Sequence, residues 1–273
     1  MSLDLQRPYE LLPDVIAVAR SAGREIMAVY ARDFDVTLKD DRSPLTAADL
    51  AAHRAISEGL ARISPQLPQL SEESAPAEIA ARREWRSLWL IDPLDGTREF
   101  VNRNGEFTVN IALVHDHEPV LGVVYAPAAG LLYAAARGAG AWQVDEQGRH
   151  AALQAAARAA QPPRVLASRS HRGTSLDALL ARLGEHTLVS AGSALKFGYL
   201  GDGRADFYPR LSPTSEWDTA AGQAVAEAAG ACVVGLDGAP LRYNARDTLL
   251  NPSFLCWADD SRDWLSLAAA NPG

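Results

Sequence analysis

The stretch that organises the chain is an apolar run that ends in two carboxylates, and it reads Trp89-Leu90-Ile91-Asp92-Pro93-Leu94-Asp95-Gly96-Thr97-Arg98-Glu99-Phe100. The apolar residues predict a buried strand that delivers the acidic side chains to a fixed place. Pro93 has no backbone N–H to donate, so we expect it to end the hydrogen-bond ladder of the strand. Gly96 permits a close turn, which would let both carboxylates converge.

Two carboxylates brought together by such a turn are suited to a hard cation. Carboxylate and carbonyl oxygens are the preferred ligands of Mg²⁺, Ca²⁺ and Mn²⁺. Residues 89–100 contain neither cysteine nor histidine, which argues against zinc. A turn that only closes the strand is the alternative, because Asp, Pro and Gly are common turn residues. The stretch by itself leaves both interpretations open.

The composition is that of an ordinary globular protein. The 273 residues are 48% hydrophobic and 22% charged, enough for one large domain or two closely packed ones. The formal net charge of −8 argues against a protein that wraps nucleic acid through its overall field. A small anionic substrate is still compatible with it, because metal ions in an acidic cluster reverse the local sign of charge. Two cysteines give neither a disulfide framework nor zinc-ligand spacing.

No pattern in the sequence directs the chain into or across a membrane. Residues 1–8 do not form a signal peptide, and no apolar run approaches ~18 residues. We therefore expect a cytoplasmic protein. Peripheral binding on the cytoplasmic side of the inner membrane is left open, because it would depend on a surface patch. The oligomeric state is also left open.

The N-terminal half is predicted to combine helices with an antiparallel sheet. Apolar residues recur at helical spacing over residues 9–31, and a second helix is expected from Thr46 as its N-cap. Residues 108–114, 120–126 and 131–136 are expected to be consecutive strands separated by turns. Together these segments predict helices packed on one sheet.

Two further acidic segments in this half are candidates for the same site. Asp49 stands three positions after the expected cap Thr46, so it could return a hydrogen bond to the cap or serve a catalytic site. Glu72 and Glu73 lie in a predicted loop shortly before the acidic strand. A solvated surface is the simpler interpretation of this pair, and a metal-ligand role for one of them is its alternative. His115 and His117 flank a predicted turn and are interpreted as exposed turn residues.

Residues 148–163, which end in Pro162-Pro163, are the best candidate for a domain boundary. We therefore expect an N-terminal α+β domain over residues 1–160, with the antiparallel sheet and most metal ligands, and a C-terminal α/β domain over 161–273. Strands and helices alternate in the second domain, which favours an α/β layer. The expected strands are 165–168, 187–191, 205–208, 231–234 and 254–257, and the expected helices are 176–183, 194–200 and 219–229.

The second half of the predicted site begins at Trp217-Asp218-Thr219-Ala220-Ala221-Gly222. Its small residues predict close backbone packing of a helix. Asp218 stands where we expect the N-cap, and an N-cap aspartate contributes about 1 kcal/mol to helix stability. Such an aspartate can also turn its free oxygen toward a cation, so the two roles are compatible.

Basic and hydroxyl residues follow predicted strands in three segments of this half. These segments are Ser168-Arg169-Ser170-His171, Gly192-Ser193-Ala194-Leu195-Lys196 and Tyr208-Pro209-Arg210. Gly192 and Ser193 precede an expected helix, where free backbone N–H groups favour an anion. Each residue taken singly is compatible with a surface charge or a cap. Their shared placement after strands favours a pocket for a polyanion.

These residues resemble a known superfamily, the lithium-sensitive, Mg²⁺-dependent inositol monophosphatase-like phosphatases. The resemblance rests on Asp92 to Thr97 paired with Trp217 to Gly222, and on the upstream Glu72-Glu73. Within the superfamily the sequence looks most like the bacterial bisphosphate nucleotidases. That likeness is carried by Asn104 to Asn110, by the three basic segments and by Asn251-Pro252.

The resemblance implies a layered α-β-α-β-α sugar-phosphatase fold and hydrolysis of 3'-phosphoadenosine 5'-phosphate to AMP, a reaction of sulfur metabolism. It implies two or three Mg²⁺ ions as cofactors. The metal ligands that it implies are Glu72, Asp92, the carbonyl of Leu94, Asp95 and Asp218. The implied catalytic residues are Asp49, Glu72 and Thr97, of which Asp49 and Thr97 orient the attacking water. The implied substrate contacts are Asp95, Gly96, Thr97, Arg98, Ser168, His171, Ser193, Lys196, Arg210 and Asp218.

Two alternatives remain beside the nucleotidase. An inositol monophosphatase or a fructose-1,6-bisphosphatase could share the fold and the metals, because substrate choice depends on the pocket. Arg98 stands where close relatives often have lysine and inositol phosphatases tend to have threonine, which favours the nucleotidase weakly. A sensor that binds a phosphate ligand without catalysis is the second alternative. The intact acidic and threonine residues argue against it.

Overall fold

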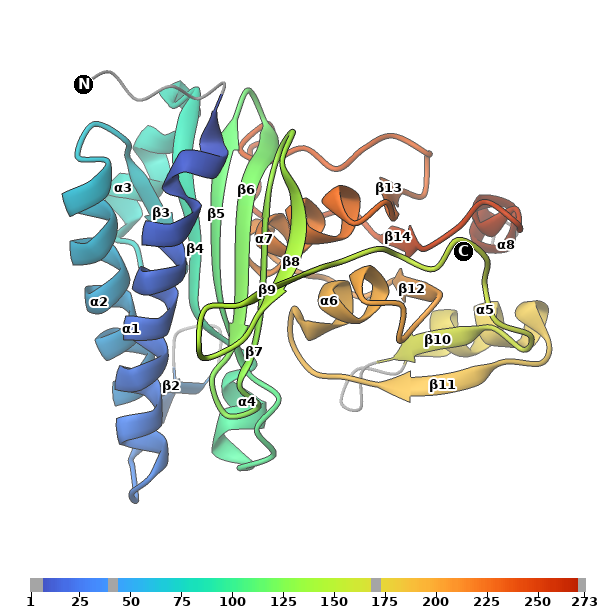
Figure 1. Cartoon of the computed structure of the whole chain (residues 1–273), viewed down its shortest axis with the longest axis horizontal. Coiled ribbons are helices and arrows are strands. Elements are labelled where there is room, and N and C mark those ends of the chain that lie inside the picture. The colour runs from blue at the N-terminus through green and yellow to red at the C-terminus, as the bar shows by residue number, and fades with distance from the viewer. Residues whose placement is uncertain (1–6, 39–43, 168–172, 270–273) are drawn as a thin grey trace.

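The computed structural model describes residues 7–38, 44–167 and 173–269 and arranges them in alternating layers of helices and sheets. Helices α1 and α2 cover one face of a seven-stranded sheet, and α6 and α7 cover the other. A five-stranded sheet lies beyond α6 and α7, and α5 and α8 lie on its far side (Figure 1). The expected α-β-α-β-α fold is therefore confirmed.

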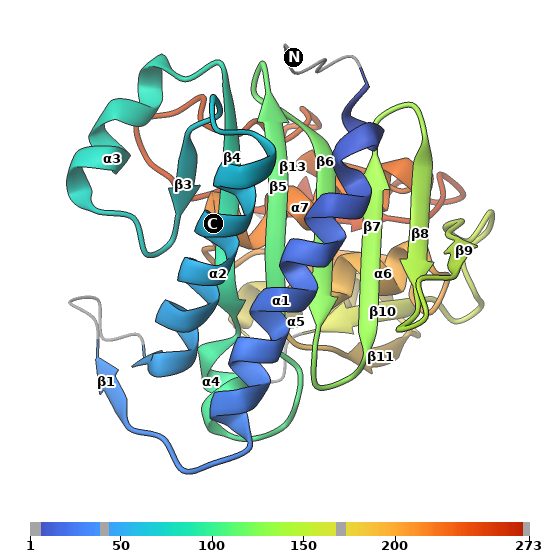
Figure 2. The ribbon, with the colours of Figure 1, turned by 60° about the vertical axis from the view of Figure 1, so that its left-hand side comes forward.

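The first layer consists of α1 (Leu12–Tyr30) and α2 (Ala47–Ile63), which pack on each other and on the sheet (Figure 2). The apolar positions that predicted α1 are the ones it buries, among them Val15, Ala19 and Ile26. The predicted N-cap Thr46 is confirmed, because its side chain accepts a hydrogen bond from the backbone of Ala48. A short 3-10 turn, η1 (Pro8–Leu11), precedes α1.

The seven-stranded sheet has the order β3-β4-β5-β6-β7-β8-β9. Only β3 runs parallel to its neighbour among these pairs, and the predicted consecutive strands form the antiparallel centre. The strands are β3 (Gln69–Ser71), β4 (Ser87–Asp95), β5 (Thr108–His115), β6 (Glu118–Ala126), β7 (Leu131–Ala136), β8 (Gly140–Val144) and β9 (His150–Ala152). As predicted, His117 is an exposed turn residue, whereas the His115 side chain is only 19% exposed and contacts Ser87 Oγ at 2.7 Å.

The expectation that Pro93 ends the ladder of β4 is wrong, because β4 continues to Asp95 through a β-bulge. Asp92 pairs with Asn110 and Asp95 pairs with Thr108, so three steps along β4 match two steps along β5. Residues three apart in a regular strand point to opposite faces of the sheet. The extra residue restores the parity, and both carboxylates face the α7 side.

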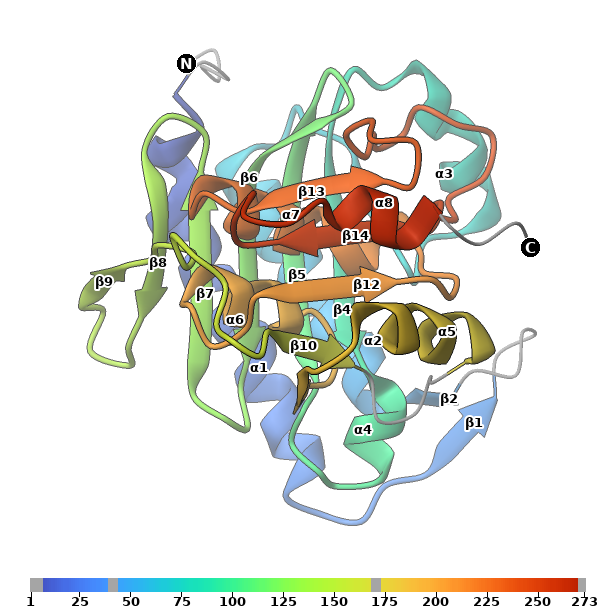
Figure 3. The same ribbon diagram turned by 90° about the vertical axis from the view of Figure 1, so that its right-hand side faces the viewer.

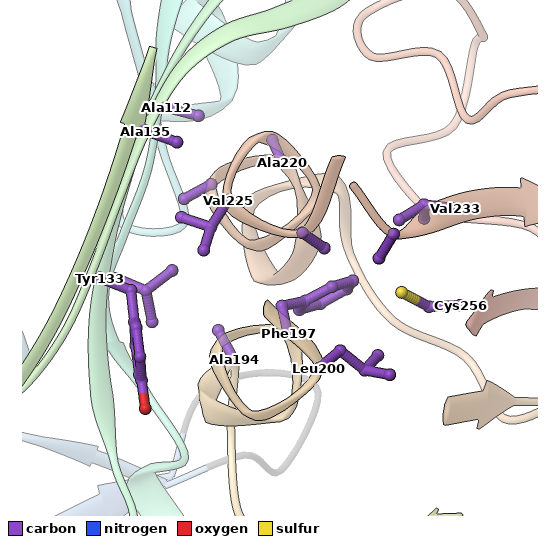
Figure 4. Packing of buried hydrophobic residues seen from close by; sticks show 14 of the residues in the cluster. Ala112, Tyr133, Ala135, Ala194, Phe197, Leu200, Ala220, Val225, Val233 and Cys256 are labelled. Atoms are coloured by element: carbon purple, nitrogen blue, oxygen red, sulfur yellow. The ribbon is translucent and has the colours of Figure 1, made fainter. Parts of the chain in front are cut away.

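The middle layer consists of α6 (Leu195–Gly201) and α7 (Glu216–Ala228), and its core joins both sheets (Figure 4). Close packing of the small residues of α7 is confirmed. A Cβ atom built on Gly222 would lie 2.2 Å from the Phe197 ring, and one built on Gly122 of β6 would lie 2.3 Å from the Ala221 carbonyl oxygen. Helix α7 therefore sits directly against β6 and against α6.

The five-stranded sheet has the order β11-β10-β12-β14-β13, and α5 (Thr174–Leu183) and α8 (Trp264–Ala269) cover its outer face (Figure 3). Its first three strands run parallel to one another, and β14 runs antiparallel to both of its neighbours, β12 and β13. The predicted alternation of strands and helices is reproduced within a few residues at each end. The strands are β10 (Arg164–Ala167), β11 (Thr187–Ser190), β12 (Phe207–Arg210), β13 (Cys232–Gly235) and β14 (Phe254–Trp257).

The remaining elements are short. They are β1 (Val36–Leu38), β2 (Pro44–Thr46), α3 (Pro76–Ala81), η2 (Arg82–Glu84) and α4 (Thr97–Val101). The chain passes from the first sheet to the second between β9 and β10, where the domain boundary is predicted. Within the three described ranges, no helix combines the length and apolar character that crossing a bilayer requires.

The contact between β6 and α7 predicts a cost for the smallest enlargement of Gly122. Gly122→Ala would press a methyl group against the Ala221 carbonyl, and overpacking of this kind costs about 1–3 kcal/mol. We expect the urea midpoint of unfolding to fall accordingly. Gly173→Ala is the matched control, because nothing lies within 4 Å of its added Cβ. Equal midpoints for the two variants would contradict the packing argument.

Candidate active site

Three carboxylates converge where β4 ends and α7 begins. Asp92, Asp95 and Asp218 each offer one oxygen, and these oxygens lie within 4.8 Å of one another. Two of them come from the bulged strand, and the third comes from a helix more than a hundred residues later in the sequence. The convergence favours the cation-site interpretation over a simple turn, and we call these residues the acidic cluster.

Asp92 is the most buried member of the acidic cluster, with 1% of its surface exposed. Its Oδ1 accepts a hydrogen bond from the backbone N–H of Leu94 at 3.0 Å. Burial, followed by the charges of Glu72, Asp95 and Asp218, raises the pKa of Asp92 well above its ordinary value. The protein thus holds a carboxylate where negative charge is unfavourable unless a cation balances it.

Asp95 is oriented by β5, the neighbouring strand. Its Oδ2 accepts hydrogen bonds from Asn110 Nδ2 at 3.3 Å and from Thr108 Oγ1 at 3.5 Å. Burial raises the pKa of Asp95 to about 6, against the opposing effect of the Lys196 charge. No role was predicted for Asn110 or Thr108, although two polar residues on one face of an otherwise apolar strand were a detectable signal.

Asp218 does not cap α7, so that prediction is wrong. The N-cap is Ser215, and Asp218 is the third helical residue, whose Oδ2 accepts the Ser215 backbone N–H at 2.8 Å. This reciprocal bond belongs to a capping box and directs the carboxylate back over the helix start. Burial, followed by the charge of Asp95, raises the pKa of Asp218 to about 7.

Glu72 follows β3 directly and belongs to the same region. Its backbone N–H donates to the Ile91 carbonyl of β4 at 3.1 Å, which fixes the residue beside the acidic strand. Its charge contributes to the raised pKa values of Asp92, Asp95 and Asp218. The placement agrees with the metal-ligand alternative for the glutamate pair.

Asp49 fills the predicted capping role and also lies beside Thr97. Its Oδ2 accepts hydrogen bonds from the backbone N–H and the hydroxyl of Thr46, each at 2.7 Å, so the predicted capping role is confirmed. Its Oδ1 lies 3.4 Å from Thr97 Oγ1, which is also 3.2 Å from the Leu94 carbonyl. The Asp49–Thr97 pair therefore adjoins the carbonyl between Asp92 and Asp95.

Gly96 brings the two halves of the site into contact. It adopts a left-handed conformation with φ of 85°, and a Cβ there would lie 2.2 Å from Ser193 Oγ. Ser193 Oγ is 2.9 Å from the carbonyls of both Asp95 and Glu106, to which its single hydroxyl hydrogen can be donated. Ser193 therefore forms a contact between the two halves of the chain, and the anion site expected at this helix start stays a prediction.

Two cations accompany the carboxylates. Lys196 is 4% exposed and its Nζ donates to the carbonyls of Ser193 at 2.7 Å and Ala191 at 3.3 Å. Burial lowers the pKa of Lys196 to about 8, although the Asp95 charge opposes the shift. Arg210 donates through Nε and Nη2 to the carbonyls of Ser212 and Pro213 at 3.2 and 3.0 Å. These bonds leave its Nη1 for other partners.

The remaining predicted contacts are less defined. Arg98 is exposed on α4, one residue after Thr97. Ser168 and His171 lie outside the described residues. Their predicted roles stay predictions.

The donor set suits a hard divalent cation. It consists of carboxylate oxygens held close together in a buried place, and oxygen ligands are those that Mg²⁺, Ca²⁺ and Mn²⁺ prefer. The raised pKa values of the acidic cluster also favour a cation, because each ionised carboxylate is destabilised by burial and by the neighbouring negative charges. A bound cation would relieve both effects.

Comparison with known proteins agrees with this geometry. The model of the inositol monophosphatase family matches residues 9–267. The chain is 51% identical over 246 residues to the 3'(2'),5'-bisphosphate nucleotidase CysQ of Escherichia coli O157:H7, an alignment that covers 89% of this chain and 98% of that protein.

Solved structures give the same result. CysQ from Bacteroides thetaiotaomicron, a bacterial member of the inositol monophosphatase family, superposes with a TM-score of 0.77 at 41% identity over 90% of this chain and 96% of that one. The inositol monophosphatase TM1415 of Thermotoga maritima has the same TM-score at 25% identity, over 93% and 94% of the two chains. The chain belongs to the inositol monophosphatase family.

Proposed function

We propose that this chain is a Mg²⁺-dependent phosphatase that removes the 3'-phosphate of 3'-phosphoadenosine 5'-phosphate and yields AMP and phosphate. The observation that carries the proposal is the acidic cluster in a chain that is 51% identical, over nearly the whole relative, to a protein named 3'(2'),5'-bisphosphate nucleotidase. The cluster supports phosphate chemistry, and the similarity supports this substrate.

The residues assigned to the cation site are Glu72, Asp92, the Leu94 carbonyl, Asp95 and Asp218, with two or three Mg²⁺ ions. When bound there, Mg²⁺ supplies neutralisation of phosphoryl charge and a lowered pKa of a coordinated water. The protein contributes the geometry. The bulge of β4 aims two carboxylates, Asn110 and Thr108 orient one of them, and the capping box of α7 aims the third.

The Asp49–Thr97 pair and Glu72 are assigned to the attacking water. Because Thr46 occupies one oxygen of Asp49, the other oxygen is held toward the Thr97 hydroxyl. That hydroxyl can accept from a water while it donates to Asp49 or to the Leu94 carbonyl. The pair can therefore orient a water and take its proton, so no side-chain nucleophile is required.

The substrate contacts are assigned to the positive side of the site. Lys196 and Arg210 place positive charge next to the acidic cluster, which suits a phosphate bound between them and the cations. Further contacts are proposed for Gly96, Thr97 and Arg98, which follow Asp95, and for Ser193, which lies three residues before Lys196. Ser168 and His171 are proposed for the second phosphate and the sugar. This side of the pocket would decide the choice of substrate.

Substrate choice gives the first test of the proposal. We expect phosphate release from 3'-phosphoadenosine 5'-phosphate in the presence of Mg²⁺, inhibition by Li⁺, and much slower release from inositol 1-phosphate. The measurement is a phosphate-release assay over these two substrates and fructose 1,6-bisphosphate. A preference for inositol 1-phosphate would favour the inositol monophosphatase alternative, and tight binding without phosphate release would favour the sensor.

Replacement of Asp92 gives the second test. Asp92→Asn keeps the shape of the side chain but removes the buried charge, so we expect turnover below about 1% of the wild-type rate. The same change removes electrostatic repulsion, so the unfolding temperature measured in a chelator should not fall. A folded variant with normal activity and normal Mg²⁺ dependence would contradict the assignment.

The pH dependence of metal binding gives the third test. Burial raises the pKa of Asp95 to about 6 and that of Asp218 to about 7, whereas unfolded aspartate has a pKa of ~3.9. The metal-free folded protein therefore binds more protons than the unfolded chain between these values, and its stability should fall as pH rises through this window. Mg²⁺ must displace those protons, so the rise in unfolding temperature on adding Mg²⁺ should be larger at pH 8 than at pH 5.5. An equal rise at both pH values would contradict the coupling.

A further inference from the structure

A long segment that follows β13 returns across the first turn of α7. The backbone N–H of Glu216 donates to the Leu249 carbonyl at 2.8 Å, and the N–H of Asn251 donates to the Thr214 carbonyl at 2.8 Å. A third bond runs from the Asn244 N–H to Glu216 Oε2 at 2.6 Å. The start of the helix that carries Asp218 is therefore attached to residues 244–251.

The Asn251 side chain makes three contacts with this helix start. Its amide nitrogen lies 2.7 Å from the Ser215 carbonyl, 2.8 Å from Thr219 Oγ1 and 3.2 Å from Thr214 Oγ1. The residue is 8% exposed, so these bonds are largely shielded from water. Two of the three acceptors can be satisfied at a time by its two N–H groups.

These contacts fix both peptide groups that flank Ser215. The Asn251 backbone holds the peptide of Thr214 through its carbonyl, and the Asn251 side chain holds the next peptide through the Ser215 carbonyl. The N–H of the first of these peptides is the group that donates to Asp218 Oδ2. The orientation of Asp218 is thus set by a peptide that Asn251 holds in place.

We propose that Asn251 is a positioning residue that aims the free oxygen of Asp218 at the cation site. The inference rests on the proposed function only in taking Asp218 as a metal ligand. Residues that orient metal ligands through hydrogen bonds typically change metal affinity by about 10–100-fold when they are replaced. Asn251 acts in this way through the N-cap of α7.

The same buried network offers a matched control in Gln223. Tyr243 OH is 3.2 Å from Thr219 Oγ1 and donates to Gln223 Oε1 at 2.6 Å, and Gln223 Nε2 donates to Glu227 at 2.9 Å. Gln223 is 2% exposed, comparable in burial to Asn251. Its bonds go to Tyr243 and, one turn later in α7, to Glu227, and neither reaches the peptide groups beside Ser215. Gln223 therefore shares the structural role but not the proposed positioning role.

The test compares Asn251→Leu with Gln223→Met, two replacements of a buried amide by an apolar side chain of similar size. Mn²⁺ is the probe, and its binding to the metal-free protein is measured from the electron paramagnetic resonance signal of the free ion. Both variants should unfold at lower temperature than the wild type. Only Asn251→Leu should weaken Mn²⁺ binding, by about tenfold or more, and raise the Mg²⁺ concentration for half-maximal phosphate release.

Two further variants make the result decisive. Asn251→Ser keeps one hydroxyl donor near the same acceptors, so it should weaken Mn²⁺ binding by a smaller factor. This variant provides the test if Asn251→Leu does not fold. In an Asp218→Asn background, replacing Asn251 should have no further effect on Mn²⁺ affinity, because the ligand that it positions has lost its charge.

Several outcomes would overturn the inference. They are wild-type Mn²⁺ affinity in a folded Asn251 variant, equal weakening in Gln223→Met, and an undiminished Asn251 effect in the Asp218→Asn background. A wild-type protein that binds Mn²⁺ but releases no phosphate from 3'-phosphoadenosine 5'-phosphate would reject the proposed function alone.

Discussion

The β-bulge at the end of β4 is the constraint on which the rest of the site depends. Asp92 and Asp95 are three residues apart, and without the extra residue one of them would point toward the α1–α2 layer. Leu94 takes that direction instead and packs in the core beneath α1 and α2, while both carboxylates face α7. The bulge thus separates, within four residues, an apolar anchor from two acidic side chains. Proline suits the position because a bulged residue need not donate to the ladder.

Burying several carboxylates together is unfavourable, and close packing of α7 on its neighbours opposes their separation. Helix α7 cannot retreat from the first sheet without losing its contact with Gly122, and it cannot shift along the layer without meeting Phe197. These contacts lie in the core that joins both sheets. Packing in the middle layer therefore opposes the repulsion within the acidic cluster, and burial there is the main reason why the pKa of Asp218 is raised.

The sequence predicted most of the elements, because apolar periodicity and turn residues are local signals. It also predicted the residues of the acidic cluster, but only the resemblance to a family joined Asp218 to Asp92, since no local signal connects positions so far apart. Its errors concern geometry. Proline was expected to stop β4, but a bulge accommodates it, and Asp218 was expected to cap α7, but Ser215 does. Both errors assume the most common local role of the residue. Tertiary contacts decide the actual conformation instead: β5 does so for Pro93, and residues 244–251 do so for the start of α7.

The two halves of the acidic cluster are held by different means, and this difference has a consequence for how the site forms. Asp92 and Asp95 are aimed by strand pairing between β4 and β5, which are neighbours in the sequence and in the sheet. Asp218 is aimed by a helix start whose own support, residues 244–251, comes later in the chain. The strand half requires only local pairing, whereas the helix half requires the second sheet and the segment that returns from it. The proposed cation site is therefore complete only when both sheets and the segment between β13 and β14 are in place, so binding of a metal there would report on the whole fold and not on the acidic stretch alone.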